Sequence, residues 1–202
     1  MILKREFYQR DPLIVAKALL GKTVVHETPE GAVSGRIVET EAYMGPEDKA
    51  SHAYGNLRTK RTETQFGQKG HAYIYLIYGM YYCFNVVSGA VPEKPEAVLF
   101  RALEPLEGIE IMKKCRPCAH GKLTELTNGP GKLCMAMGLT KRQNGADLCA
   151  PPFYIKDDDV IVAESDIVQT TRIGVDYANE WKHKLWRFYI KDCPFVSVKI
   201  KK

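Results

Sequence analysis

Two glutamates in the stretch GRIVETEAY, Glu39 and Glu41, have the residue type and spacing best suited to chemistry. On a strand, both side chains point to one face, and their Cα atoms lie about 7 Å apart. Such a pair can carry out acid–base catalysis, or bind a divalent metal together with Asp48 and His52. The spacing matches no strong metal-binding signature. The alternative interpretation is an exposed polar strand face without chemistry.

An apolar and aromatic run, AYIYLIYGMYYCFNVV at 72–87, provides the second candidate. Its pattern around Gly79 predicts a strand, a tight turn and a second strand. Tyrosines within a sheet usually serve packing, but Tyr78 falls at the tip of this hairpin, where a ring has little to pack on. A bulky side chain there can instead act as a wedge between DNA base steps, inserted from the minor groove.

A cysteine motif provides a third, weaker candidate. Cys115 and Cys118 form a C-x2-C pattern, with His120 two residues further on. A zinc site needs a second pair, and Cys134 and Cys149 lack the spacing of a standard finger. We therefore interpret these cysteines as unligated thiols and expect no metal.

Start and stop signals predict the helices around these motifs. Asp11 and Pro12 begin a short amphipathic helix that ends at Gly21, and a strand follows. A second helix starts near Pro130 in GPGKLCMAMGL. GPGK lacks the spacing of a phosphate loop, although the free N–H groups of a helix start can bind phosphate. A third helix is expected over 106–114.

Strand patterns dominate the middle of the chain. Besides the hairpin, strands are predicted from Gly31 through the two glutamates, at 96–105, and as short strands in the tail after Val160. Residues 46–70 are polar and predict a loop with a short helical turn. This order favours one α+β domain over residues 1–202, with an antiparallel sheet and flanking helices.

Composition limits the class of protein. The 202 residues carry a net charge of +5 and a pI near 8.8, which permits a polyanionic partner without requiring one. The opening MILKREFYQRDPL contains no signal peptide, so we expect reduced thiols. The longest apolar run is too short and too polar for a membrane span. These features predict a soluble intracellular protein.

Six blocks of sequence, in this order, resemble the alkyladenine (3-methyladenine) DNA glycosylase family over nearly the whole chain: IVETEAYMGPEDKASHAYG, HAYIYLIYGMYYCFNVV, VLFRALEPLEG, TNGPGKLCMAMGL, RIGVDYANEW and WRFYIKDCPFVS. The resemblance implies base-excision repair by base flipping and monofunctional hydrolysis, without a cofactor or AP-lyase activity. The implied substrates are 3-methyladenine, 7-methylguanine, hypoxanthine and ethenoadenine in double-stranded DNA, and the product is an abasic site. The implied fold is a single mixed domain with a curved sheet and a hairpin that projects into the minor groove, and we expect a monomer.

The resemblance also assigns the residues of the reaction. Glu41 matches the catalytic carboxylate, which deprotonates a water aimed at C1′ and stabilises the oxocarbenium-like state. Arg101 matches the residue that helps to hold this water, and its charge favours the ionised carboxylate. Glu39 is expected to be a structural partner. No lysine occupies a nucleophile position in these motifs, so we expect no Schiff base and no strand cleavage.

The same resemblance assigns the recognition of the base. Tyr43, His52 and Tyr75 match the residues that sandwich the flipped base, for which electron-rich rings suit a cationic purine. Asn85 matches the asparagine that rejects guanine through its 2-amino group. Tyr78 matches the intercalating tyrosine that fills the gap in the stack, and Met80 would lie beside it at the tip.

Contacts with the DNA backbone are expected from several further positions, because many residue types can bind phosphate. Leu57 stands where a basic residue is expected from animal members of the family. The chain also lacks their long basic N-terminal extension, which favours a bacterial source and a cytoplasmic, nucleoid-associated protein; a eukaryotic source would imply the nucleus. The expected backbone contacts are Arg58, Thr59, Arg61, Lys132 and Arg172.

Two other functions remain open at this stage. One is a metal-dependent nuclease or phosphodiesterase built on Glu39, Glu41, Asp48 and His52, which a chelator would inactivate. The other is an architectural DNA-binding module that inserts Tyr78 and bends DNA but releases no base.

Overall fold

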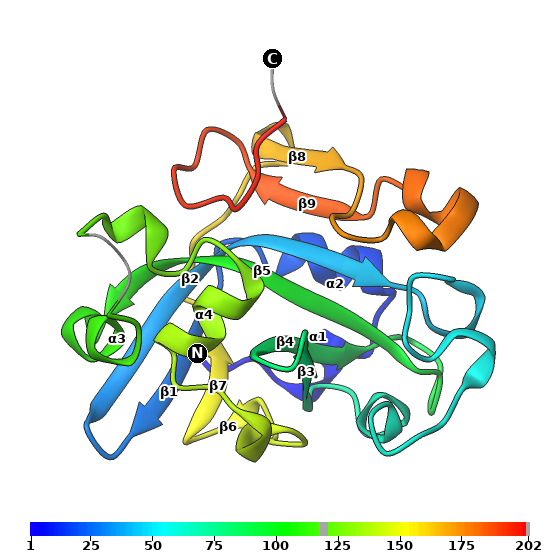
Figure 1. The fold of residues 1–202 in the computed structure, drawn as a ribbon, viewed down its shortest axis with the longest axis horizontal. Helices are drawn as coiled ribbons and strands as arrows, with labels where there is room; N and C mark the ends of the chain where they lie inside the picture. The colour runs from blue at the N-terminus through cyan, green and yellow to red at the C-terminus, as the bar shows by residue number, and fades with distance from the viewer. Residues whose placement is uncertain (118–120, 201–202) are drawn as a thin grey trace.

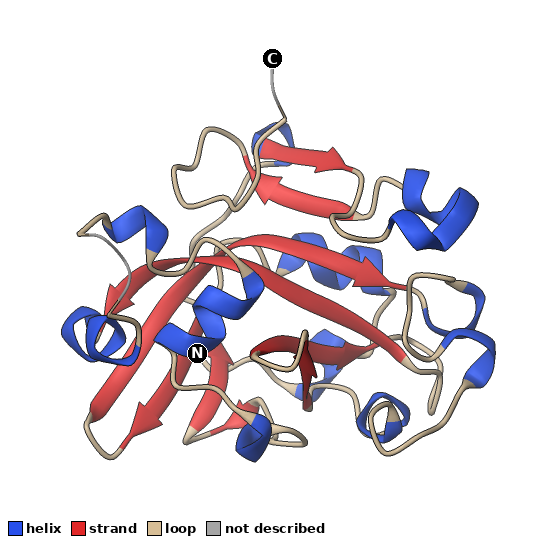
Figure 2. Ribbon diagram, in the orientation of Figure 1, coloured by secondary structure: helices blue, strands red, loops and turns tan. Residues whose placement is uncertain are grey.

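The computed structural model describes residues 1–117 and 121–200, and it shows a mixed α/β fold built on an antiparallel sheet (Figures 1 and 2). The strands are β1 Thr23–Thr28, β2 Gly31–Tyr43, β3 Ala72–Ile77, β4 Tyr81–Ser88, β5 Glu96–Glu107, β6 Cys149–Ala150, β7 Phe153–Lys156, β8 Ile167–Thr170 and β9 Arg187–Ile190. The α-helices are α1 Arg5–Tyr8, α2 Pro12–Ala18, α3 Ile109–Cys115 and α4 Pro130–Ala136. Short 3-10 turns η1 to η7 occur at Gly45–Glu47, Tyr54–Asn56, Glu63–Phe66, Leu123–Glu125, Lys141–Gln143, Glu164–Asp166 and Asp176–His183. None of the helices in the described ranges has the length and hydropathy that a membrane crossing requires.

The long strands β2 and β5 form the centre of the sheet (Figure 2). The strand order is β3-β4-β5-β2-β1-β7-β6, and β9 pairs both with β2 and with β8. The sheet curls into a half-barrel, so the expectation of a curved antiparallel sheet in a mixed domain is confirmed. One half of β2 pairs with β1 and the other half with β9, which places the segment of the two glutamates between β5 and β9.

Local signals located several elements correctly. The carboxylate of Asp11 accepts a hydrogen bond from the Leu13 N–H at 2.7 Å, which caps α2 at its start. The strand from Gly31, the hairpin of β3 and β4, and the helix that starts at Pro130 are also confirmed. In each case the signal depends on neighbours in sequence, so the rest of the fold does not alter it.

Two expectations about elements need correction. The helix predicted over 106–114 begins only at Ile109, because β5 continues to Glu107 and Gly108 turns the chain with a φ of +68°. In the tail, residues 160–163 form no strand. They cross close to Gly21, where an added Cβ would lie 3.0 Å from Val162, so the first strand of the tail is β8.

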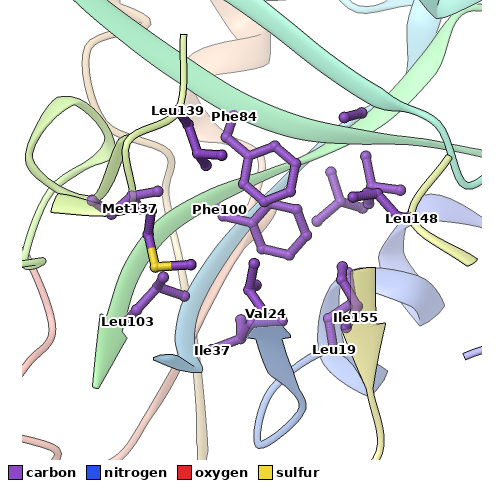
Figure 3. Close-up of a cluster of buried hydrophobic side chains, with 14 of the residues drawn as sticks. Leu19, Val24, Ile37, Phe84, Phe100, Leu103, Met137, Leu139, Leu148 and Ile155 are labelled. Carbon is purple, nitrogen blue, oxygen red and sulfur yellow. The ribbon is translucent and has the colours of Figure 1, made fainter. Parts of the chain in front are cut away.

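The alternation of side chains along the strands divides the sheet into two faces. On β3, β4 and β5, Ile74, Phe84 and Phe100 point into the hydrophobic core, where the two phenylalanine rings stack with centroids 4.4 Å apart (Figure 3). Their neighbours in sequence point to the opposite face. Residues of β1 and β7, together with residues that directly follow α2 and α4, complete the core on the inner side of the curl, among them Val24, Ile155, Leu19, Met137 and Leu139.

Candidate active site

A cavity of about 810 Å³ opens on the face of the sheet opposite the core. Its floor is formed by the side chains that alternate with the core residues, including Tyr73 and Tyr75 of β3, Asn85 of β4, and Leu99 and Arg101 of β5. Three other segments form its walls: residues 50–61, 129–135 and 173–177. The period of the strands thus explains why the hairpin is so rich in tyrosine, because one face packs and the other lines the cavity.

An aromatic slot lies in this cavity. Tyr43, His52 and Tyr75 all line it, so the structure brings together the three residues expected to sandwich a base. The His52 ring meets the Tyr75 ring edge-on, with centroids 4.5 Å apart and an interplanar angle of 84°. The centroid of the Tyr73 ring lies 5.3 Å from that of Tyr75.

Both ring nitrogens of His52 have polar partners. Nδ1 lies 3.1 Å from the Tyr73 hydroxyl, and Nε2 lies 3.3 Å from Nη2 of Arg61. Burial, and then the positive charge of Arg61, lower the pKa of His52 from 6.5 to about 4. The imidazole is therefore neutral at physiological pH.

Glu41 lies directly behind the wall of the cavity. Its carboxylate is fully buried, and Arg101, Tyr43 and Ile173, all of which line the cavity, contact it. Oε1 is 3.2 Å from Nη1 of Arg101 and accepts the Ile173 N–H at 2.8 Å, while Oε2 accepts the Tyr43 hydroxyl at 2.9 Å. Burial and the adjacent Glu41 raise the pKa of Tyr43 well above its usual value, so the phenol stays a donor. A carboxylate has about four acceptor positions, so Oε2 retains capacity for a water proton.

A pair of register shifts positions Arg101. The pairing of β2 with β5 passes from Ile37–Leu103 to Glu39–Ala102 and then to Thr40–Phe100, so Arg101 has no residue opposite it on β2. Such bulges redirect side chains. Here the guanidinium lies between the two glutamates, with Nε 3.1 Å from Glu39.

Glu39 is held by structural contacts. Its Oε1 accepts from Arg101 and, at 2.8 Å, from Nη1 of Arg187 on β9, and its Oε2 accepts the Ser197 N–H at 2.7 Å. The carboxylate is fully buried. Glu39 therefore joins β2, β5, β9 and the C-terminal segment, and a buried charge with two cationic partners is well compensated.

Arg172 lies inside the protein, behind the aromatic slot. Its side chain is fully buried and forms a two-pronged ion pair with Asp48, with Nη2 2.9 Å from Oδ1. The guanidinium lies between the rings of Tyr43 and Trp186, at 4.7 and 5.0 Å from their centroids. Arg172 therefore braces Tyr43 from inside the protein, and its expected contact with the DNA backbone stays a prediction.

The hairpin tip carries the two residues expected there. Tyr78 is 80 % exposed and Met80 is 66 % exposed, and Tyr78 lines the mouth of the cavity. Tyr78 and Gly79 both have positive φ, +53° and +69°, and the Met80 N–H donates to the Ile77 carbonyl to close the turn. A tyrosine in the left-handed region is uncommon, which is consistent with a role for the ring outside the fold itself.

Asn85 forms part of the cavity floor. It is buried, and its Nδ2 donates to the Tyr73 carbonyl at 3.1 Å. Its side chain is therefore held in one orientation beside the aromatic slot.

The remaining expected contacts lie around the rim. Lys132 lines the cavity, and its Nζ donates to Asn128 at 2.8 Å. Arg58 and Thr59 are exposed but do not line it; Arg58 pairs with Glu63, and Thr59 Oγ1 accepts from N–H groups of its own loop. Arg61 lines the cavity.

The alternative metal set does not assemble. Asp48 is occupied by Arg172 and Glu41 by Arg101, and no three metal-ligating side chains converge anywhere in residues 1–117 and 121–200. Cys115 is exposed, whereas Cys118 and His120 lie outside the described residues.

Sequence reasoning missed two contributors to the site. The Ile173 N–H donates to Glu41, and Tyr177 lines the cavity with its hydroxyl 3.2 Å from the Ala50 carbonyl. Both belong to the block RIGVDYANEW. That block was part of the resemblance, but a backbone donor leaves no signal in a side-chain motif.

An aromatic slot, backed by a carboxylate–arginine pair and flanked by an exposed hairpin, suits an enzyme that acts on a single nucleobase. Comparisons with known proteins agree with this class. The family model for methylpurine-DNA glycosylase (MPG) matches residues 6–194. A relative from Desulfitobacterium hafniense is 50 % identical over 204 residues, and one from Clostridium acetobutylicum is 52 % identical over 206, each alignment covering 98 % of both chains. Both relatives carry the provisional name 3-methyladenine DNA glycosylase.

These findings define a DNA-repair hydrolase of the glycosylase class, which acts on N-glycosyl bonds in DNA during base-excision repair. The chain belongs to the methylpurine-DNA glycosylase family.

Proposed function

We propose that this protein rotates a damaged purine out of duplex DNA and hydrolyses its N-glycosidic bond, leaving an abasic site. The substrates are alkylated or deaminated purines, namely 3-methyladenine, 7-methylguanine, hypoxanthine and ethenoadenine, and one monomeric domain spanning residues 1–202 carries out the reaction. The observation that supports this best is the position of the aromatic slot directly in front of the Glu41–Arg101 pair.

The slot suits a flipped purine. Electron-rich rings at Tyr43 and Tyr75 can stack on the base, and a cationic alkylated purine gains a further cation–π attraction. His52 adds no positive charge of its own, because burial and Arg61 lower its pKa to about 4. Tyr78, at the mouth of the cavity, would fill the gap left in the stack.

Glu41 and Arg101 would perform the hydrolysis. Oε2 of Glu41 takes a proton from a water while the water oxygen attacks C1′. The C1′–N bond breaks, and its electron pair leaves with the base. The carboxylate stabilises the positive charge that develops on the sugar, and Arg101 orients the water and the carboxylate. Lys132, the lysine of the cavity rim, is bound to Asn128, and we propose that no Schiff base forms and no strand is cut.

A gel assay tests this function. The protein is incubated with a labelled duplex that contains one hypoxanthine, with and without chelator, and each sample is analysed before and after hot alkali. A break that appears only after alkali, in both samples, supports a metal-independent monofunctional glycosylase. A break before alkali indicates a lyase or nuclease. If neither occurs, release of 3-methyladenine from alkylated DNA is measured next, and DNA bending without release of any base would indicate an architectural protein.

Replacing Tyr78 with asparagine should weaken binding to lesion-containing duplex about 30-fold, since a stacked base contact is worth about 2 kcal/mol. Asparagine tolerates a positive φ, so the turn itself should remain intact. Dissociation constants measured by fluorescence anisotropy test this. Tyr154→Asn, on β7 at the other end of the sheet, is the control and should bind like the wild type. Equal affinities for all three proteins would contradict the wedge.

Replacing Asn85 with serine should raise the release of 7-methylguanine relative to hypoxanthine by about tenfold. The shorter side chain leaves room for a 2-amino group, and a single small group in a pocket is worth about this much in discrimination. Single-turnover rates on the two lesions measure the ratio. An unaltered ratio in a folded variant would remove Asn85 from the selection of the base.

A further inference from the structure

Arg61 makes three contacts within the aromatic slot. Its Nη2 lies 3.3 Å from Nε2 of His52 and 3.4 Å from the Leu76 carbonyl oxygen. The carbon of its guanidinium lies 5.0 Å from the centroid of the Tyr75 ring. One exposed arginine thus touches two of the three rings that form the slot.

These contacts determine the protonation of His52. A guanidinium has only donors, so Nε2 of His52 accepts and carries no proton. The proton of the neutral ring is therefore on Nδ1, which donates to the Tyr73 hydroxyl at 3.1 Å. Burial raises the pKa of Tyr73 to about 12, so this partner is a neutral phenol that can accept the bond.

None of the charged and titratable groups that face His52 would stabilise a second proton, on Nε2. They are Arg61 from the loop at 57–62, and Tyr73 and Tyr75 from β3. Arg61 is a fixed cation, and the two phenols are neutral because burial raises the pKa of each. Among the described residues no carboxylate bonds to the imidazole, so a protonated ring would have no counter-charge.

We propose that Arg61 is a positioning residue that holds His52 neutral, as the Nδ1–H tautomer, so that the slot admits positively charged alkylated purines. An imidazolium in the buried part of the slot would repel a cationic base strongly, whereas the charge of the exposed Arg61 is screened by water. The effect should be smaller for a neutral base such as hypoxanthine. This role differs from a phosphate contact, and its substrate selectivity rests on the proposed glycosylase function.

The first arm of the test needs no DNA. Nitrogen-15 NMR of the free protein reports the tautomer of His52 and its titration. The wild type should show a protonated Nδ1 and titrate near pH 4. Arg61→Met keeps the stem that packs on Tyr75 but removes the donor and the charge, so the midpoint should rise by about one pH unit and the tautomer preference should weaken. Arg61→Lys should recover the low midpoint, and Lys60→Met, which removes a neighbouring exposed charge, should change neither property.

The second arm compares single-turnover release of 7-methylguanine and hypoxanthine between pH 4.5 and 8. For Arg61→Met, the ratio of the two rates should match the wild type at pH 8 and fall by about threefold at pH 4.5, the fall expected for a midpoint one unit higher. An unchanged His52 titration, with equal loss on both lesions at every pH, would show that Arg61 only binds DNA and would overturn the proposal. If no base is released, the proposed function fails, while the NMR arm still decides whether Arg61 controls His52.

Discussion

Replacing Glu41 with glutamine should lower the single-turnover rate of base release by about 1,000-fold and leave affinity for lesion DNA close to that of the wild type. The variant loses the base that activates water and the negative charge that stabilises the sugar cation. Each is worth at least 100-fold in typical enzymes, and the two losses do not simply multiply, because one carboxylate supplies both effects. Rates on a hypoxanthine duplex at saturating protein, together with binding curves, measure both quantities.

The hydrogen bonds around Glu41 can be retained in the glutamine variant, so the fold should not change. Glutamine retains an acceptor oxygen for the Ile173 N–H and Arg101, and its amide can donate to the Tyr43 hydroxyl, which rotates to accept. The control is Glu104→Gln on β5, which changes the same chemistry in a pair with Arg36 and does not line the cavity. Turnover of the Glu41 variant within tenfold of the wild type would mean that the general base lies elsewhere.

Replacing Arg172 with methionine should lower the free energy of unfolding by about 4 kcal/mol, the typical cost of leaving a buried charge without its partner. Asp48 is fully buried and also accepts the N–H groups of Met44 and Ala50, so its carboxylate cannot turn to solvent. The variant also removes the guanidinium that packs on Tyr43. Urea denaturation gives the loss of stability.

A second variant separates this effect from lost packing. Arg172→Met combined with Asp48→Asn should be more stable than Arg172→Met alone, because the uncompensated charge is gone. Lys49→Met removes the more exposed pair with Glu180 nearby and should cost less than about 1 kcal/mol. If Arg172→Met lowers the free energy of unfolding no more than Lys49→Met does, and instead weakens DNA binding, then Arg172 contacts the phosphate backbone as the sequence predicted.

The sequence by itself determined the elements whose signals are local. Asp11 and Pro12 begin α2, Pro130 begins α4, and the alternation around Gly79 produces the hairpin. The period of two along 72–87 also determined that one set of tyrosines would share a face. Family resemblance then named residues from separate blocks, among which Tyr43, His52, Tyr75, Asn85 and Arg101 line one cavity.

Only the tertiary structure decided how these residues are held and charged. The Ile173 N–H reaches Glu41 across 132 residues of sequence, and Arg172 reaches Asp48 across 124. The register shift that leaves Arg101 between two glutamates arises from the pairing of β2 with β5. Burial placed the Arg172 side chain against Asp48 and Tyr43, and it made His52 a neutral ring. Strand pairing and burial depend on which distant segments meet. The strength of an electrostatic interaction depends on the distance between the charges and on their exposure to water, and the residue type alone determines neither.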